Sequence, residues 1–321
     1  MHGSADIQQC HVSNMAAFSQ PGANAGRGVR TTCQFNTKIH DHEGPGKHQW
    51  TPDPLSNHGF DASRTGFFAD NVSVSLSEDG TTYTIKAAVN EDNICNITVK
   101  KAAPGFMAGE NGTTFYGTDP KHPWGSMWHK IWPRATASGT MQTKKKTYNL
   151  NGRAVFIHAL QGMKPHHAAA RWNFINFQTP TYSAIMMEFI TPPSYGKTVV
   201  NVGCIAKDGE ILYAGCSNTV KHLAATTDPV TDWPEPKALL CNWTGKSVEA
   251  ELLADLPERT DRVDVLAHIP TIIKNLIGGV VGTKPIIFQY ISNDKMTLKV
   301  KENGKETSET GRLFCEATFI L

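Results

Sequence analysis

The chain has 321 residues, of which 40% are hydrophobic and 19% are charged, and its net charge is +2. This length supports one or two domains with a full hydrophobic core. This net charge is too small to indicate a nucleic-acid-binding protein. No segment is long enough and apolar enough to be a transmembrane helix. The one basic run, 144–146, is interpreted as a solvated loop or strand edge.

Cysteine usage argues against a disulfide framework or a zinc site. There is no Cys-x-x-Cys pair and no Cys/His spacing typical of zinc. An odd number of cysteines without a secretory signal predicts reduced thiols in the cytosol. We therefore expect no metal and no cofactor. The seven cysteines are Cys10, Cys33, Cys95, Cys204, Cys216, Cys241 and Cys315.

The chain is predicted to be all-β after a disordered start. Residues 1–28 show no hydrophobic periodicity and are predicted to be disordered. From Arg30 onward, short strands are separated by turn signals, which is the pattern of a sandwich or barrel. The strands expected before Pro165 are 72–77, 81–89, 94–100, 125–132, 136–143, 148–150 and 153–160. Those expected after it are 170–178, 181–191, 198–206, 210–214, 238–243, 248–253, 261–267, 286–291, 295–301 and 312–320.

The strongest hairpin signal joins 170–178 to 181–191 through a turn at 178–181. Pro180 can supply a preset φ in this turn. A strand with one solvent-exposed face alternates regularly between apolar and polar residues. These two strands are apolar on both faces, so we predict that a barrel interior covers one face and a second packed layer covers the other.

Two further local patterns lead to specific expectations. A two-residue turn at Asp208-Gly209 would place Cys204 opposite Tyr213. Residues 269–281 carry apolar side chains at helical spacing, with Pro270 in the first turn. This pattern predicts one short amphipathic helix that packs on the second barrel.

Several polar and aromatic residues are candidates for chemistry. His166 and His167 point to opposite faces of an extended chain and cannot chelate one metal together. The spacing of Asp119, His122 and His129 matches no zinc site. Trp128 and Trp132 would share one strand face, which is either core or the wall of a ligand cavity.

Seven segments resemble the fungal survival factor 1 (Svf-like) family, and the resemblance covers about residues 29–321. It rests on GTDPKHPWGSM (117–127), FIHALQGMKPHHAAARWNFINFQTPTYSAIMMEFITP (156–192), VVNVG (199–203), DPVTDWPEP (228–236), ERTDRVDV (258–265), GTKPIIFQY (282–290) and LFCEATFI (313–320). It implies two tandem lipocalin-like barrels, at 29–164 and 165–321, that meet near Pro165. Family members usually begin with an acetylated amphipathic helix that holds the membrane, followed by strands that open the first barrel. Residues 1–28 match neither, so we expect the anchor to be missing and the first barrel to be incomplete.

The resemblance also implies a function. The expected protein is a monomeric, non-enzymatic carrier of ceramide between endoplasmic reticulum and Golgi membranes. It would occur in cytoplasm and nucleus, contact membranes transiently and peripherally, bind no nucleic acid, and support survival under oxidative stress. Burial of an acyl chain contributes about 0.8 kcal/mol per CH₂, and methionine adapts to flexible apolar ligands. The candidate ligand contacts are Trp128, Trp132, Met163, Trp172, Phe174, Met186 and Met187.

Two alternatives remain. A lipocalin-like hydratase or cyclase acting on an apolar polyene would need an acid or base in an apolar cleft. Its candidates are Asp119, His129, His158 and Glu188. Convergence of two of these groups in one pocket would favour the enzyme, whereas isolated positions would favour the carrier. A stress-signalling adaptor without a ligand would instead have a filled barrel interior.

Overall fold

A computed structural model describes residues 10–11, 15–18, 32–41, 47–63, 65–119, 121–144, 146–161, 163, 165–264, 284–292 and 296–321. Strands dominate these residues, which confirms the all-β prediction. The chain divides into two compact units. Unit 1 contains Met1–Lys101 and Ala135–Ala154, and unit 2 contains Ala102–Arg134 and Val155–Leu321. These bounds differ from the boundary expected at Pro165, which remains a prediction.

Unit 1 holds two groups of hydrogen-bonded strands that are linked by side chains. In the first group, β1, β2 and β4 all pair with β3. In the second, β5 to β9 pair in chain order. Asn93 links the groups because it accepts from Thr37 Oγ1 at 2.9 Å and donates to Asp53 Oδ2 at 2.7 Å. The strands are β1 (Cys10–His11), β2 (Met15–Phe18), β3 (Thr32–Asp41), β4 (Lys47–Leu55), β5 (Gly59–Phe60), β6 (Phe67–Ala69), β7 (Val72–Leu76), β8 (Thr82–Asn90) and β9 (Asn93–Lys101).

The structure differs from the prediction of disorder for residues 1–28 at two short segments. β1 and β2 both lie within this range, and their backbones form antiparallel ladders with β3. The hydrophobic pattern did not predict them because strands of two and four residues are too short to display a period.

Two long strands run through both units. β12 (Gly125–Gln142) pairs near its start with β10 (Phe106–Met107) and β11 (Thr113–Tyr116), and towards its end with β9. β13 (Thr147–Gln161) also pairs with β12. The sequence predicted two strands in place of each. Gly139 lies in β12 with φ 131°, and a Cβ there would collide with the carbonyl oxygen of Asn96, so this position requires glycine.

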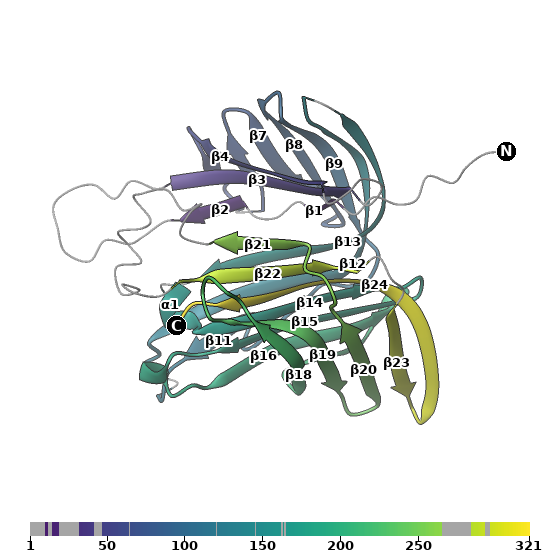
Figure 1. Ribbon diagram of the computed structural model, residues 1–321. Coiled ribbons are helices and arrows are strands. Elements are labelled where there is room, and N and C mark those ends of the chain that lie inside the picture. Colours follow the sequence, from purple (N-terminus) through teal and green to yellow (C-terminus); the bar gives the residue numbers. More distant parts are fainter. Residues whose placement is uncertain are drawn as a thin grey trace. The chain divides into compact units, whose positions relative to one another are not determined.

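Unit 2 contains one large antiparallel sheet in the order β17-β16-β15-β14-β24-β23-β20-β19-β18 (Figure 1). β22 pairs with β24, and β21 pairs with β22. Among the described strands, no ladder joins β17 to β18, so the sheet does not close into a barrel through backbone hydrogen bonds. The predicted helix at 269–281 lies outside the described residues. The elements are α1 (Pro165–Ala168), β14 (Arg171–Gln178), β15 (Tyr182–Ile190), η1 (Pro193–Tyr195), β16 (Val199–Lys207), β17 (Glu210–Gly215), β18 (Asn218–Thr227), β19 (Pro234–Thr244), β20 (Val248–Asp255), β21 (Asp261–Asp264), β22 (Ile286–Ile291), β23 (Met296–Glu302) and β24 (Lys305–Phe319).

The predicted hairpin is confirmed as β14 and β15, and a buried arginine supports its turn. Thr179 N donates to Tyr182 O at 2.8 Å, which closes the turn. Arg134 Nη1 donates to the carbonyl oxygens of Thr179 and Tyr182 at 3.3 and 3.2 Å, and Arg134 Nη2 donates to that of Pro180. Glu309 accepts the backbone N–H of Thr181 at 3.0 Å. The turn is therefore held by β12 and by β24.

Both faces of the hairpin are covered, as predicted. The inner face of the sheet packs into a hydrophobic cluster of unit 2, called here the barrel core, which includes Ile175, Phe177 and Met186. On the opposite, outer face, Met187 packs in a second cluster with Ile131 of the β10–β13 layer. This double burial explains why the two strands lack a polar face.

The register of β16 and β17 corrects one expectation. The two strands pair with a bulge between Ile205 and Ala206. Cys204 therefore lies opposite Ala214, and Tyr213 lies opposite Ile205. The prediction that Cys204 faces Tyr213 was wrong by one residue because a bulge adds one residue to one strand.

No helix among the described residues has the length and apolarity to cross a membrane. Of the six cysteines whose side chains the structure describes, five are buried free thiols and Cys216 is an exposed one. No group of three His, Cys, Asp or Glu side chains in the described ranges is placed to hold a metal ion.

Candidate functional site

The predicted ligand contacts of the β14–β15 hairpin lie on both faces of the sheet. On the outer face, Trp172 pairs across the ladder with Phe189, and Phe174 pairs with Met187. These four side chains are half-buried. Met186 lies on the inner face and is fully buried in the barrel core. A ligand on one face therefore cannot contact all of the predicted hairpin residues.

The other predicted contacts lie in the β10–β13 layer or beside it. Trp132 is fully buried, with its ring centroid 5.1 Å from that of Phe156. Trp128 is half-buried, with its ring 5.1 Å from His158. Met163 packs against a small apolar cluster that Phe189 of β15 also contacts. The seven predicted residues thus occupy several places in unit 2, and their contact with a ligand remains a prediction.

The four candidate acid or base groups do not converge. Asp119 is exposed and its Oδ2 lies 2.7 Å from Nδ1 of His122. His129 is buried without a hydrogen-bond partner for Nδ1 in the described structure, and burial lowers its pKa to about 4. Burial also lowers the pKa of His158. Glu188 lies on the inner face of β15, and no hydrogen bond among the described residues joins any two of the four.

Glu188 instead belongs to a group of polar side chains between β18 and the inner face of β14–β16. Its Oε1 accepts from Asn173 Nδ2 at 3.4 Å, and its Oε2 accepts from Asn201 Nδ2 and from the backbone N–H of Val220, both at 3.1 Å. The group bridges the part of the sheet where the ladder does not close. We call it the polar seam, and its members are Asn173, Glu188, Asn201, Asn218 and His222.

The hydrogen bonds of the seam determine the tautomer of His222. The amide nitrogen of Asn173 donates to Glu188, which leaves its Oδ1 to face His222. The His222 Nε2 atom lies 2.9 Å from this Oδ1 and must carry a proton to donate. Burial, with a smaller contribution from Arg171, lowers the pKa of His222 to about 4. The neutral ring therefore keeps its lone pair on Nδ1.

Three acceptor atoms of the seam make no hydrogen bond to the described residues. Asn201 uses its Nδ2 on Glu188, and its buried Oδ1 has no partner. Asn218 donates Nδ2 to Gly215 O at 2.9 Å, and its buried Oδ1 also has no partner. His222 makes one hydrogen bond, through Nε2. The two amide oxygens are buried, and buried polar atoms without partners are uncommon in native proteins, so they indicate a site that a ligand or water completes.

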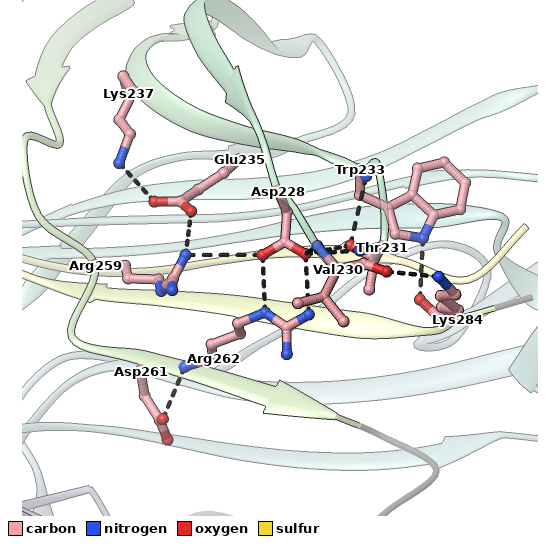
Figure 2. Close-up of polar contacts among 10 residues, drawn as sticks. All are labelled: Asp228, Val230, Thr231, Trp233, Glu235, Lys237, Arg259, Asp261, Arg262 and Lys284. Atoms are coloured by element: carbon pink, nitrogen blue, oxygen red, sulfur yellow. Dashed lines mark hydrogen bonds and ion pairs between the residues drawn. The ribbon is translucent and has the colours of Figure 1, made fainter.

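An aromatic stack adjoins the seam at His222. The His222 ring lies 6.4 Å from Phe319, and Trp233 stacks on Phe319 at 5.3 Å with an interplanar angle of 21°. Trp233 Nε1 donates to the carbonyl oxygen of Lys284 at 3.0 Å (Figure 2). Polar and apolar surface therefore meet at this end of the seam, as in sites that bind amphipathic molecules.

A cluster of ion pairs holds the segment that carries Trp233. Arg262 donates Nε and Nη2 to the buried carboxylate of Asp228 at 2.8 and 3.0 Å (Figure 2). Glu235 pairs with Arg259 and with Lys237. Hydrogen bonds from Arg262, followed by those from Thr231, hold the pKa of Asp228 well below its usual range. Because these charges are paired with one another, the cluster is a structural clamp.

The comparisons with known proteins agree on one family. The family model described as "Svf1 family" matches residues 23–321. The chain is 52% identical over 316 residues to the ceramide-binding protein svf1 of Aspergillus fumigatus, covering 91% of this chain and 80% of that protein. It is 50% identical over 314 residues to the ceramide-binding protein svf-1 of Neurospora crassa, and the match covers 96% of this chain and 82% of that protein.

The chain belongs to the Svf1 family. Two solved structures resemble this Svf1-family chain in their fold. A putative AttH protein from Nitrosomonas europaea has a TM-score of 0.60 at 15% identity, covering 92% of this chain and 84% of that one. Kievitone hydratase from Nectria haematococca has a TM-score of 0.57 at 12% identity, and the match covers 90% of this chain and 80% of that one. These likenesses show the lipocalin-like fold that the sequence predicted.

Sequence reasoning missed most of the polar seam of this Svf1-family chain. It named Glu188 as a candidate acid, but not His222 or the three asparagines. β18 was not predicted, so His222 had no assigned face. Asn218, Val220 and His222 occupy every second position of β18, but no apolar alternation marks this strand in the sequence.

Proposed function

We propose that this Svf1-family chain binds a ceramide-type sphingolipid and shields it from water without catalysing a reaction. The observation that carries the proposal is the 50–52% identity, over most of the chain, to relatives named as ceramide-binding proteins. The isolation of Asp119, His129, His158 and Glu188 from one another supports a carrier over a hydratase or cyclase, because acid–base catalysis needs groups within reach of one substrate.

The proposed role extends to carriage of the lipid. Burial of acyl chains contributes about 0.8 kcal/mol per CH₂, so a protein that covers part of a lipid lowers the free-energy barrier to its passage through water. We propose transient peripheral contact with endoplasmic reticulum and Golgi membranes, and a monomeric carrier in cytoplasm and nucleus that supports survival under oxidative stress. The support for these parts is the family resemblance.

The test is extraction of lipid from vesicles. Purified full-length chain is incubated with phosphatidylcholine vesicles that contain a trace of labelled ceramide, and the protein is then separated from the vesicles. We expect saturable ceramide in the protein fraction and little labelled phosphatidylcholine. Ceramide no higher than with heat-denatured protein would contradict the proposal.

A further inference from the structure

We propose that the polar seam of unit 2 is the head-group site, where Asn201 Oδ1, Asn218 Oδ1 and His222 Nδ1 accept hydrogen bonds from the hydroxyl and amide N–H groups of the lipid. The inference rests on the proposed lipid-binding function and names the part of the ligand that the chain would recognise. It also names residues outside the predicted contact set.

The seam atoms that have no hydrogen-bond partner determine what kind of ligand can bind there. Each seam side chain already directs its donor to a fixed partner: Asn201 to Glu188, Asn218 to Gly215, and His222 to Asn173. The seam atoms without a partner are acceptors, so a ligand that satisfies them must supply hydrogen-bond donors. Ceramide carries two hydroxyl groups and one amide N–H. A triacylglycerol or a cholesteryl ester carries none.

The three acceptor atoms are carried by two strands of unit 2, β16 and β18. Asn218 and His222 lie four residues apart on β18 and therefore share a strand face. Asn201 lies on β16, two residues before Gly203, where an added Cβ would meet Asn218 Oδ1 at 2.9 Å. The three acceptors thus belong to facing strands of one sheet. His222 is half-buried, so part of its side chain is exposed at the surface of unit 2.

Aromatic side chains lie beside the polar seam. Phe319 belongs to the barrel core and lies between His222 and Trp233 in the ring contacts described above. A lipid with its hydroxyl groups on the seam would find aromatic surface beside them for the start of its acyl chain. Glu188 supplies no donor to the ligand, and its position orients Asn173 and Asn201.

The experiment pairs a ligand change with a side-chain change. Binding of short-chain ceramide to the purified full chain is compared with binding of its di-O-methyl analogue, which keeps the apolar bulk and loses both hydroxyl donors. We expect the wild-type protein to bind ceramide about 10-fold more tightly, the order expected when buried polar groups lose their partners. His222→Phe and Asn218→Leu should each reduce this preference to about 3-fold or less.

The control is His158→Phe, which alters another half-buried histidine away from the seam and should keep the wild-type preference. Asn218→Leu is the second seam variant because it leaves all contacts of Glu188 in place, so the test survives if His222→Phe fails to fold. Wild-type protein that prefers ceramide, with both seam variants showing the same preference, would overturn the head-group site and leave lipid binding intact. Wild-type protein that binds neither lipid would overturn both.

Discussion

The carboxylate of Glu188 on β15 accepts the backbone N–H of Val220 on β18 at 3.1 Å. A side chain thus satisfies a backbone group at the place where β18 has no ladder to β17. Glu188 also accepts from Asn173 and Asn201. One buried carboxylate therefore connects four strands, β14, β15, β16 and β18, and sets the polar seam.

Replacement of Glu188 should destabilise unit 2 strongly. Glu188→Leu leaves three donors without an acceptor, and each unpaired buried donor costs about 1–3 kcal/mol, so we expect a loss of at least about 3 kcal/mol in the free energy of unfolding. Glu188→Gln keeps one acceptor oxygen and should lose about 1–2 kcal/mol. Urea unfolding measures both values. Glu251→Gln, at an exposed carboxylate, should change stability little, and a Glu188→Leu protein as stable as this control would contradict the role of Glu188.

The Asp228–Arg262 pair should matter far more than a surface pair. The Asp228 side chain is 1% exposed and accepts five hydrogen bonds, two of them from Arg262. Asp228→Ala leaves a partly buried guanidinium without its partner, and we expect a loss of about 3–5 kcal/mol. Lys299→Ala breaks an exposed ion pair and should cost about 0.5 kcal/mol or less. Equal losses in urea unfolding would show that the cluster is not a clamp.

Acid sensitivity should depend on His129. Its pKa is about 4 in the folded chain and about 6.5 when unfolded, so the unfolded state binds more protons between these values. This contribution to stability is complete above pH 6.5 and is lost as the pH falls towards 4, by up to roughly 3 kcal/mol. His129→Leu should flatten the dependence of unfolding free energy on pH between 7 and 4.5. An unchanged slope would mean that His129 is not buried as a neutral ring.

The hairpin turn should loosen when Arg134 is removed. Arg134→Met takes donors from the carbonyl oxygens of Thr179, Pro180 and Tyr182 while keeping much of the apolar stem, and we expect a loss of about 2–3 kcal/mol. Hydrogen exchange should rise first at residues 178–182. Arg153→Met, at an exposed arginine of β13, should leave exchange at the turn at the wild-type rate. Exchange at the turn that stays at the wild-type rate in Arg134→Met would contradict the support of the turn by Arg134.

Local patterns predicted the hairpin because its information is local. β-prone residues on both sides of Pro180 indicated two strands and a turn, and the double apolar faces indicated two covering layers. The register at Cys204 was wrong by one residue because the bulge after Ile205 has no signal in the turn Asp208-Gly209. β12 and β13 were split because polar residues within long strands resemble turns.

The polar seam was not predictable in the same way. Glu188 and Val220 are 32 residues apart, and Asn173 and His222 are 49 residues apart. Their contacts depend on how β18 lies against β14–β16, which a hydrophobic pattern does not encode. β18 itself lacks the apolar alternation of a strand, since its inward positions include Asn218 and His222. Polar residues at inward positions hide a strand from pattern analysis and at the same time form the candidate site.

Native mass spectrometry tests the central claim most directly. The purified full chain is incubated with vesicles that contain ceramide and an equal amount of cholesteryl ester, then separated from them and measured under non-denaturing conditions. The account predicts a complex of one protein and one ceramide, and a reduced share of that complex for Asn218→Leu. A spectrum with only the ligand-free mass, at ceramide concentrations that saturate the vesicles, would contradict it.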